Sequence, residues 1–266
     1  MHRVSDFSGP TAVLRWAKEE IAIFDAAQKI FFEKNKGDKF SELNHATGIV
    51  TFGVSFPNEV PEVITRSCYR AISDLRNVLD QAVFSASCIL DTKGKIEKTA
   101  FPFAETQKEL RSALRTAHKG QRYPGIPYGL HGNLISFEPW WTESDDGTGN
   151  DLLRVLNSIA NPNKHLVPVE IHTSGSNSFF GSRGHIVWIG NEARGDGKIE
   201  LCKAVFGTPI KLDTDFYPEF CFRNASILTG KPILPALNAL AAMVEEIILS
   251  IEAETVRLQA QLNQSS

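Results

Sequence analysis

Apolar residues recur every three to four positions along several stretches of the chain, a period that predicts amphipathic α-helices. The clearest stretch runs from Ile64 to Ile89, where apolar side chains fall on one side at about 100° per residue. Pro10 suits the first position of an earlier helix, and Thr106 with Glu109 has the spacing of a capping box. The predicted helices cover residues 10–35, 60–90, 106–119, 151–161 and 233–262.

A period of two replaces this pattern between Val50 and Phe56, where apolar residues alternate with small or polar ones. Such alternation predicts a half-buried β-strand. Its predicted hairpin partner runs from Phe40 to His45, with the turn at Thr47-Gly48, so this first strand region covers residues 40–56. Further strands are predicted within residues 166–223, where the stretch from Thr173 to Gly184 reads as a Ser/Gly loop.

These elements together predict an α+β fold, in which a bundle of four to five helices has an antiparallel sheet packed on or beside it. Residues 120–150 are rich in Gly, Pro and aromatic residues and predict a long, partly ordered connection with room for one short helix. We find no internal repeat and no clean linker. The sequence therefore favours a single composite domain over residues 1–266.

The charge balance argues against a chain-wide interaction with polyanions. The 266 residues carry a formal net charge of −3. A basic field that would attract nucleic acid or an anionic membrane is absent, although a local basic patch is still allowed. The first residues lack the apolar stretch of a signal peptide, and no run approaches the roughly 18 apolar residues that span a bilayer. We therefore expect a soluble, cytoplasmic protein with no membrane partner.

Cysteine and histidine spacing gives no metal or cofactor motif. Cys68, Cys88, Cys202 and Cys221 form no CxxC pair, and we interpret them as buried free thiols. His165 and His172 are separated by an odd spacing, which on a straight strand places them on opposite faces. No phosphate-binding loop or calcium loop matches its pattern. We expect no metal and no cofactor.

One candidate polar cluster lies on the predicted helix over 60–90 and contains Arg76, Asn77 and Asp80. Arg76 and Asp80 are four residues apart, so their side chains can touch at the edge of the apolar stripe. Asn77 faces further outward. A structural ion pair is the interpretation we favour, and the alternative is an arginine held by a carboxylate and aimed into a cleft.

A second candidate cluster lies where the helix over 151–161 ends, and it contains Asn157, Asn163, Lys164 and His165. Lys and His favour the negative end of a helix dipole, so a C-terminal cap explains them. The alternative interpretation makes His165 an acid/base or a phosphate contact, with Lys164 supplying charge. We favour the cap.

Segments of the chain resemble an uncharacterised bacterial protein family. The run Leu75 to Gln81 is similar to that family's block Leu-Arg-Ser-Ala-Leu-Asp-His, and Leu156 to His165 is similar to its block Leu-Asn-x-x-Asp-Lys-His-Arg. Phe101-Pro102 resembles the family's Phe-Pro-Ile segment between them. The order agrees over roughly Pro61 to His165. The resemblance implies relatives but no reaction.

Arginine followed after four residues by histidine also resembles the motif of the HEPN superfamily of helical ribonucleases and nucleotide-binding proteins. The chain has Gln81 where this motif has histidine. Gln cannot act as a general base near neutral pH. If the fold is shared, either the catalytic half of the motif is lost or His165 supplies it from elsewhere.

Two functions from different classes follow, and the sequence leaves open whether the protein is an enzyme. In the first, it is a structural or small-ligand-binding scaffold, and both clusters are structural or hold a small anion. In the second, it is a nucleic-acid-directed enzyme, a ribonuclease or nucleotidyl-modifying protein, in which Arg76 stabilises a phosphate, Asn77 orients it and His165 is the acid/base. The second predicts Arg76 and His165 close together across one cleft.

A homodimer is also conceivable. The predicted helix over 233–262 is long and apolar, and a second copy of the chain could cover its stripe. The same stripe could equally be used inside the monomer.

Overall fold

Helices form where the apolar period of three to four residues predicts them, and a sheet accompanies them, which confirms the α+β class. The period fixes helix positions because each helix must bury its apolar stripe. The predicted helices are α1 (Ser8–Lys34), α2 (Glu62–Ile89), α3 (Gln107–Arg115), α5 (Asp151–Ala160) and α6 (Ile233–Gln264).

The computed structural model describes residues 6–56, 60–90, 99–115, 123, 125–142, 147–160, 169–174, 177–180, 186–193, 197–214, 217–223 and 225–264. The chain divides into two compact units. The first consists of Met1–Ala22, Cys68–Leu166 and Pro235–Ser266, and the second of Ile23–Ser67 and Val167–Leu234. The helices α1 and α2 contribute residues to both. The expected single composite domain stays a prediction, and each unit is described by itself.

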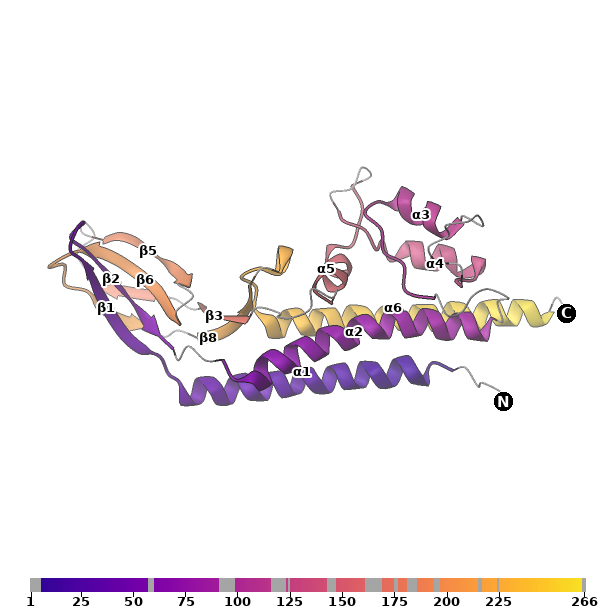
Figure 1. The fold of residues 1–266 in the computed structure, drawn as a ribbon, viewed down its shortest axis with the longest axis horizontal. Helices are drawn as coiled ribbons and strands as arrows, with labels where there is room; N and C mark the ends of the chain where they lie inside the picture. The colour runs from indigo at the N-terminus through magenta and orange to yellow at the C-terminus, as the bar shows by residue number, and fades with distance from the viewer. Residues whose placement is uncertain are drawn as a thin grey trace. The chain divides into compact units, whose positions relative to one another are not determined.

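The first unit is built on α1, α2 and α6, which lie side by side (Figure 1). Lys18 of α1 pairs with Glu245 of α6 at 2.8 Å, and Arg70 of α2 pairs with Glu20 of α1 at 3.3 Å. Apolar side chains between the three helices are withdrawn from water and form the core. Fully buried members include Ala17, Ile72, Leu75, Val78, Leu79, Leu237, Leu240, Val244 and Ile251.

The connection predicted over residues 120–150 contains a short 3-10 helix, η2 (Tyr128–Leu130), followed by the short helix α4 (His131–Ser136). The helix α4 is tied to α6 by a hydrogen bond of 2.9 Å from Asn133 Nδ2 to Ser250 Oγ. Trp140 is fully buried, and its indole N–H donates to the carbonyl oxygen of Thr148 at 2.8 Å. The buried indole thus anchors the described residues around it.

The second unit contains an antiparallel sheet with strand order β1-β2-β6-β5 (Figure 1). The predicted hairpin forms its first half, with β1 (Asp38–Asn44) joined to β2 (Ile49–Ser55) by a turn in which Asn44 accepts the backbone N–H of Ala46. The strand β2 then pairs with β6 (Lys198–Val205), which pairs with β5 (Ile186–Ala193).

The second unit also shows where the strand prediction was wrong. The stretch from Thr173 to Gly184, predicted to be a Ser/Gly loop, contributes the end of β3 (Val169–Ser174) and all of β4 (Asn177–Phe180). These strands pair with β8 (Tyr217–Phe222) and β7 (Lys211–Thr214). Strand pairing with partners distant in sequence overrides weak local propensity.

Close backbone approach at Gly53 fixes the pairing of β2 between β1 and β6. A Cβ atom at Gly53 would lie 2.6 Å from the Phe40 ring and closer still to the carbonyl oxygen of Ile199. Gly53 also sits where the register between β2 and β6 shifts. Only glycine lets the neighbouring strands approach so closely.

We therefore predict that Gly53→Ala lowers the free energy of unfolding by about 1–3 kcal/mol, because the added methyl overpacks the sheet. Urea denaturation followed by circular dichroism measures the change. Gly132→Ala in α4 is the matched control, since its Cβ would meet no atom within 4 Å. Equal effects of the two substitutions would contradict the steric argument.

The four cysteines form no disulfide with one another. Cys68, Cys202 and Cys221 are buried, as predicted, whereas Cys88 is only half-buried. Burial raises the pKa of the Cys68 thiol to about 12. Because the thiolate is the reactive form, Cys68 is protected both by access and by protonation.

We predict that a thiol reagent at about pH 8 modifies Cys88 in the native protein long before Cys68. Mass-spectrometric mapping of the modified peptides against time checks the order. In denaturant, where both thiols are exposed, Cys68 must be modified as fast as Cys88. Equal native rates at the two positions would show that Cys68 is not buried in solution.

Among the described residues, one helix, α6, is long and apolar enough to cross a bilayer by length and composition. Of its most apolar window, 44% is buried inside the protein. Core helices of water-soluble proteins have the same length and composition, so this property is weak support for a membrane span.

Candidate functional site

Arg76 projects from the middle of α2 and is largely withdrawn from water, with 19% of its side chain exposed. Its Nη1 atom lies 2.5 Å from Asp80 Oδ1, one helical turn along, as the spacing predicts. The two opposite charges form an ion pair, although among the described residues no acceptor is aligned for a hydrogen bond from Nη1. The Nε atom donates a hydrogen bond of 3.1 Å to Asn157 Oδ1 on α5.

An aromatic ring completes the surroundings of the guanidinium. Arg76 Cζ lies 4.7 Å from the centroid of the Phe103 ring, within the range of a cation–π contact. Phe103 itself is buried, and its ring packs against that of Phe101 at 5.2 Å. The guanidinium is therefore contacted at once by the Asp80 carboxylate, the Asn157 amide and the Phe103 ring.

Asp80 has a second task besides pairing with Arg76. Its Oδ1 atom accepts the backbone N–H of Phe101 at 2.8 Å. The backbone of Phe103 is held as well, since its N–H donates to the hydroxyl of Tyr123 at 3.2 Å. The segment Phe101–Ala104 has no helix or strand of its own, so these side-chain acceptors satisfy its buried amides.

We name Arg76, Asp80, Asn157, Phe101 and Phe103 the Arg76 network. It joins three parts of the first unit, namely α2, the segment Phe101–Ala104 and α5. The structure thus brings one member of the second predicted cluster, Asn157, onto the first.

The other predicted site residues fall elsewhere. Asn77 is exposed on α2 and lies outside the Arg76 network. Asn163, Lys164 and His165 lie outside the described residues, so their proximity to Arg76 stays a prediction.

Arg154 was missed by sequence reasoning, although it forms a comparable contact set on α5. It is 8% exposed, and its Nη2 lies 2.6 Å from Oε1 of Glu105. Its guanidinium also lies 5.2 Å from the centroid of the Trp141 ring. The signal was available, because Arg154 interrupts the apolar run Leu152–Leu156 on the buried side of the helix.

His131 at the start of α4 is a half-buried titratable group away from the Arg76 network. Burial lowers the pKa of its imidazole, and the charge of Arg115 acts in the same direction, against a hydrogen bond to the Ile126 carbonyl that raises it. Its Nδ1 atom is buried without a hydrogen-bond partner among the described residues. The native state therefore favours the neutral ring.

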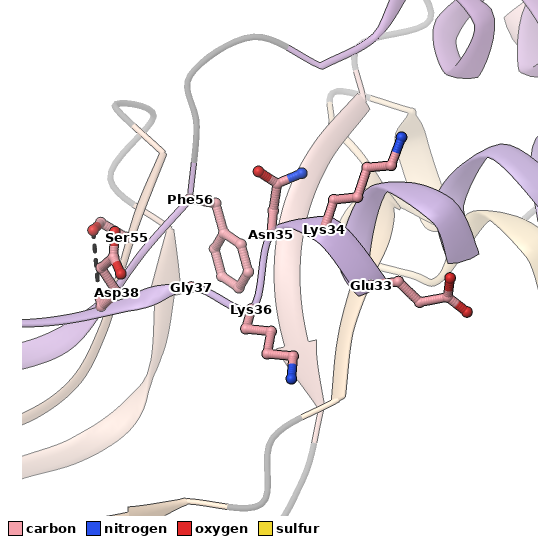
Figure 2. A pocket seen from close by; sticks show the side chains of 8 residues that line it. All are labelled: Glu33, Lys34, Asn35, Lys36, Gly37, Asp38, Ser55 and Phe56. Carbon is pink, nitrogen blue, oxygen red and sulfur yellow. Dashed lines mark hydrogen bonds between the residues drawn. The ribbon is translucent and has the colours of Figure 1, made fainter.

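Two cavities are lined by residues outside the Arg76 network. The first, of about 550 Å³, lies in the second unit where α1 gives way to β1. Figure 2 shows the Phe56 ring within it, with the Lys34 and Lys36 side chains leading away on different sides. Its charged groups do not converge on one point. Its lining residues are Glu33, Lys34, Asn35, Lys36, Gly37, Asp38, Ser55 and Phe56.

The second cavity, of about 530 Å³, lies in the first unit between the α4–α5 region and α6. Three carboxylates line it, those of Glu138, Asp151 and Glu246. Asp151 already accepts the backbone N–H of Thr142 at 2.8 Å. Within the described part of the chain, no group of three or more His, Cys, Asp or Glu side chains is arranged to hold a metal ion.

No protein-family model, curated protein or solved structure matches the chain. The resemblance to a bacterial family and to the HEPN motif therefore stays a prediction. The function has to be argued from the contacts themselves.

We predict that His131 makes the protein less stable as the pH falls from about 7.5 to about 5. The unfolded chain takes up a proton near the ordinary histidine pKa of about 6.5, whereas the native ring resists it. Stability from this group is present above that pKa and is lost below it. Urea denaturation of the wild type and of His131→Gln at both pH values measures the effect, and the variant must show the smaller decline. Equal declines would contradict the burial of this ring.

Proposed function

We propose that this protein is a non-enzymatic scaffold, and that the Arg76 network has a structural role, in which it holds α2, the segment Phe101–Ala104 and α5 together. The observation that carries the proposal is the contact set of the guanidinium. Asp80, Asn157 and Phe103 occupy its edge and one face. An arginine that serves a phosphate must present donors to a cleft, whereas Nε of Arg76 donates to Asn157 and Nη1 lies against the carboxylate of Asp80.

The role of Asp80 supports the same proposal. A carboxylate that only activated an arginine would need no backbone partner, yet Asp80 also satisfies the amide of Phe101. Loss of either side chain would leave a buried charge or a buried amide without its partner. Such losses are expressed in stability, because the uncompensated group must be desolvated in the native state.

We predict that Arg76→Ala lowers the free energy of unfolding by about 2–4 kcal/mol, since it leaves Asp80 and Asn157 without their partner. Asn157→Ala, which removes one acceptor, costs about 1–2 kcal/mol. The two changes must be non-additive, because both remove the same contact. Chemical denaturation of the two single variants and the double variant measures the coupling.

Asn77→Ala is the matched control, because Asn77 is exposed on the next position of the same helix. A scaffold tolerates this change, with stability equal or slightly higher because Ala favours a helix. The nucleic-acid-directed enzyme makes the opposite prediction, in which Arg76→Ala and Asn77→Ala both abolish cleavage of a mixed RNA substrate while the fold stays intact. That result would overturn the scaffold.

We further propose that the scaffold binds a small ligand, and this is tested separately. Thermal-shift screening of the full chain against nucleotides, RNA and small acids identifies ligands by the rise in melting temperature that binding produces. The α1–β1 cavity is the first site to test, because it is a hollow of about 550 Å³ that Lys34 and Lys36 border. The rise in melting temperature that a ligand produces must be smaller in Lys34→Ala or Lys36→Ala, and it must be unchanged in Arg76→Lys.

A further inference from the structure

The helix α6 has a second apolar face besides the one that builds the core. Its buried side chains, such as Leu240, Val244 and Ile251, point into the first unit. On another side, exposed residues follow each other at alternating steps of four and three. We name these the outer seam of α6; its members are Ala242, Glu246, Leu249, Ala253, Val256 and Ala260.

The outer seam exposes large apolar side chains at the spacing of a coiled-coil. Leu249 is 59% exposed and Val256 is 61% exposed, seven residues apart on the same helix. Single exposed apolar residues are common on protein surfaces. An apolar seam with steps of three and four is the pattern by which one helix packs on another. Most of the stripe that suggested a homodimer is buried inside the monomer, whereas Val256 is exposed on the outer seam, so the seam is the face of α6 that a partner could cover.

The seam is complementary to a second copy of itself in an antiparallel arrangement. In one register, Leu249 faces Ala260 of the second copy, and Ala253 faces Val256 of the second copy. The twofold axis repeats both pairs in reverse. Every large side chain then meets an alanine, so two helices can approach closely without overpacking.

Charge favours the same register. Glu246, the one charged member of the seam, faces Asn263 of the second copy, whose amide can donate a hydrogen bond to the carboxylate. In a parallel, in-register pair Glu246 would instead face itself within an apolar seam. Two carboxylates opposed in this way repel each other. The antiparallel pair avoids that repulsion.

We propose that a second copy of this chain packs antiparallel on the outer seam of α6, with Leu249 against Ala260 and Ala253 against Val256. The dimer goes beyond the scaffold function and does not involve the Arg76 network. It gives the scaffold two copies of each unit, related by a twofold axis.

Sedimentation equilibrium of the full chain over a concentration series tests the dimer. The expected mass approaches twice 29.4 kDa as the concentration rises. Leu249→Glu raises the dissociation constant at least about tenfold, because it places an unpaired charge in the seam. Trp16→Glu, which changes an exposed apolar residue of α1 instead, leaves the dissociation constant unchanged. Circular dichroism confirms that both variants fold.

Size exchange tests the register. Ala260→Leu alone places leucine against leucine and weakens the dimer. Adding Leu249→Ala restores one large and one small side chain to each pair, and with them the dimer. A dissociation constant that neither change alters would overturn the proposed register.

Orientation is measured with spin labels on Asn238→Cys in a Cys88→Ser background, since Asn238 lies outside the paired segment. At a rise of 1.5 Å per residue, the antiparallel register separates the two labels by about 50 Å. A parallel pair would hold them about 10 Å apart. The short distance, a monomer at every concentration, or a monomer that binds lipid vesicles through Leu249 would each overturn the proposal.

Discussion

The guanidinium of Arg76 is contacted from three parts of the helical unit at once. It lies mostly out of water, where an unpaired charge would be strongly destabilising. The cost is offset by Asp80, Asn157 and the Phe103 ring, which come from α2, α5 and the segment between them. Because Asp80 also holds the backbone of Phe101, the charge pair organises a stretch of chain that has no regular secondary structure.

Part of this site could be predicted from the sequence. The spacing of Arg76 and Asp80 predicts their contact, since helical geometry alone brings such residues together. The role of Asn157 and of the Phe101 amide could not be predicted, because both depend on tertiary packing. For Arg154 the sequence indicates a buried charge, because the residue interrupts the apolar run on α5. Its partners Glu105 and Trp141 could not be predicted, since they come from different segments.

The fold shows the same division between local and distant determinants. Helices with long apolar stripes, such as α2 and α6, could be predicted almost to their ends. The hairpin of β1 and β2 was predictable too, because alternation and turn residues are local signals. The strand β4 and the end of β3 were missed, since their pairing with β7 and β8 is set by residues distant in sequence.

The order of segments along the chain has a consequence for biosynthesis. The helical unit is assembled from three segments that lie far apart in the sequence, so Lys18 of α1 can meet Glu245 only after α6 has been made. A ribosome would have to translate α6 before the apolar stripes of α1 and α2 could be covered. Until then the nascent chain exposes both, and chaperones that bind apolar segments have their longest opportunity on this unit. The bundle therefore cannot close before α6 has been translated.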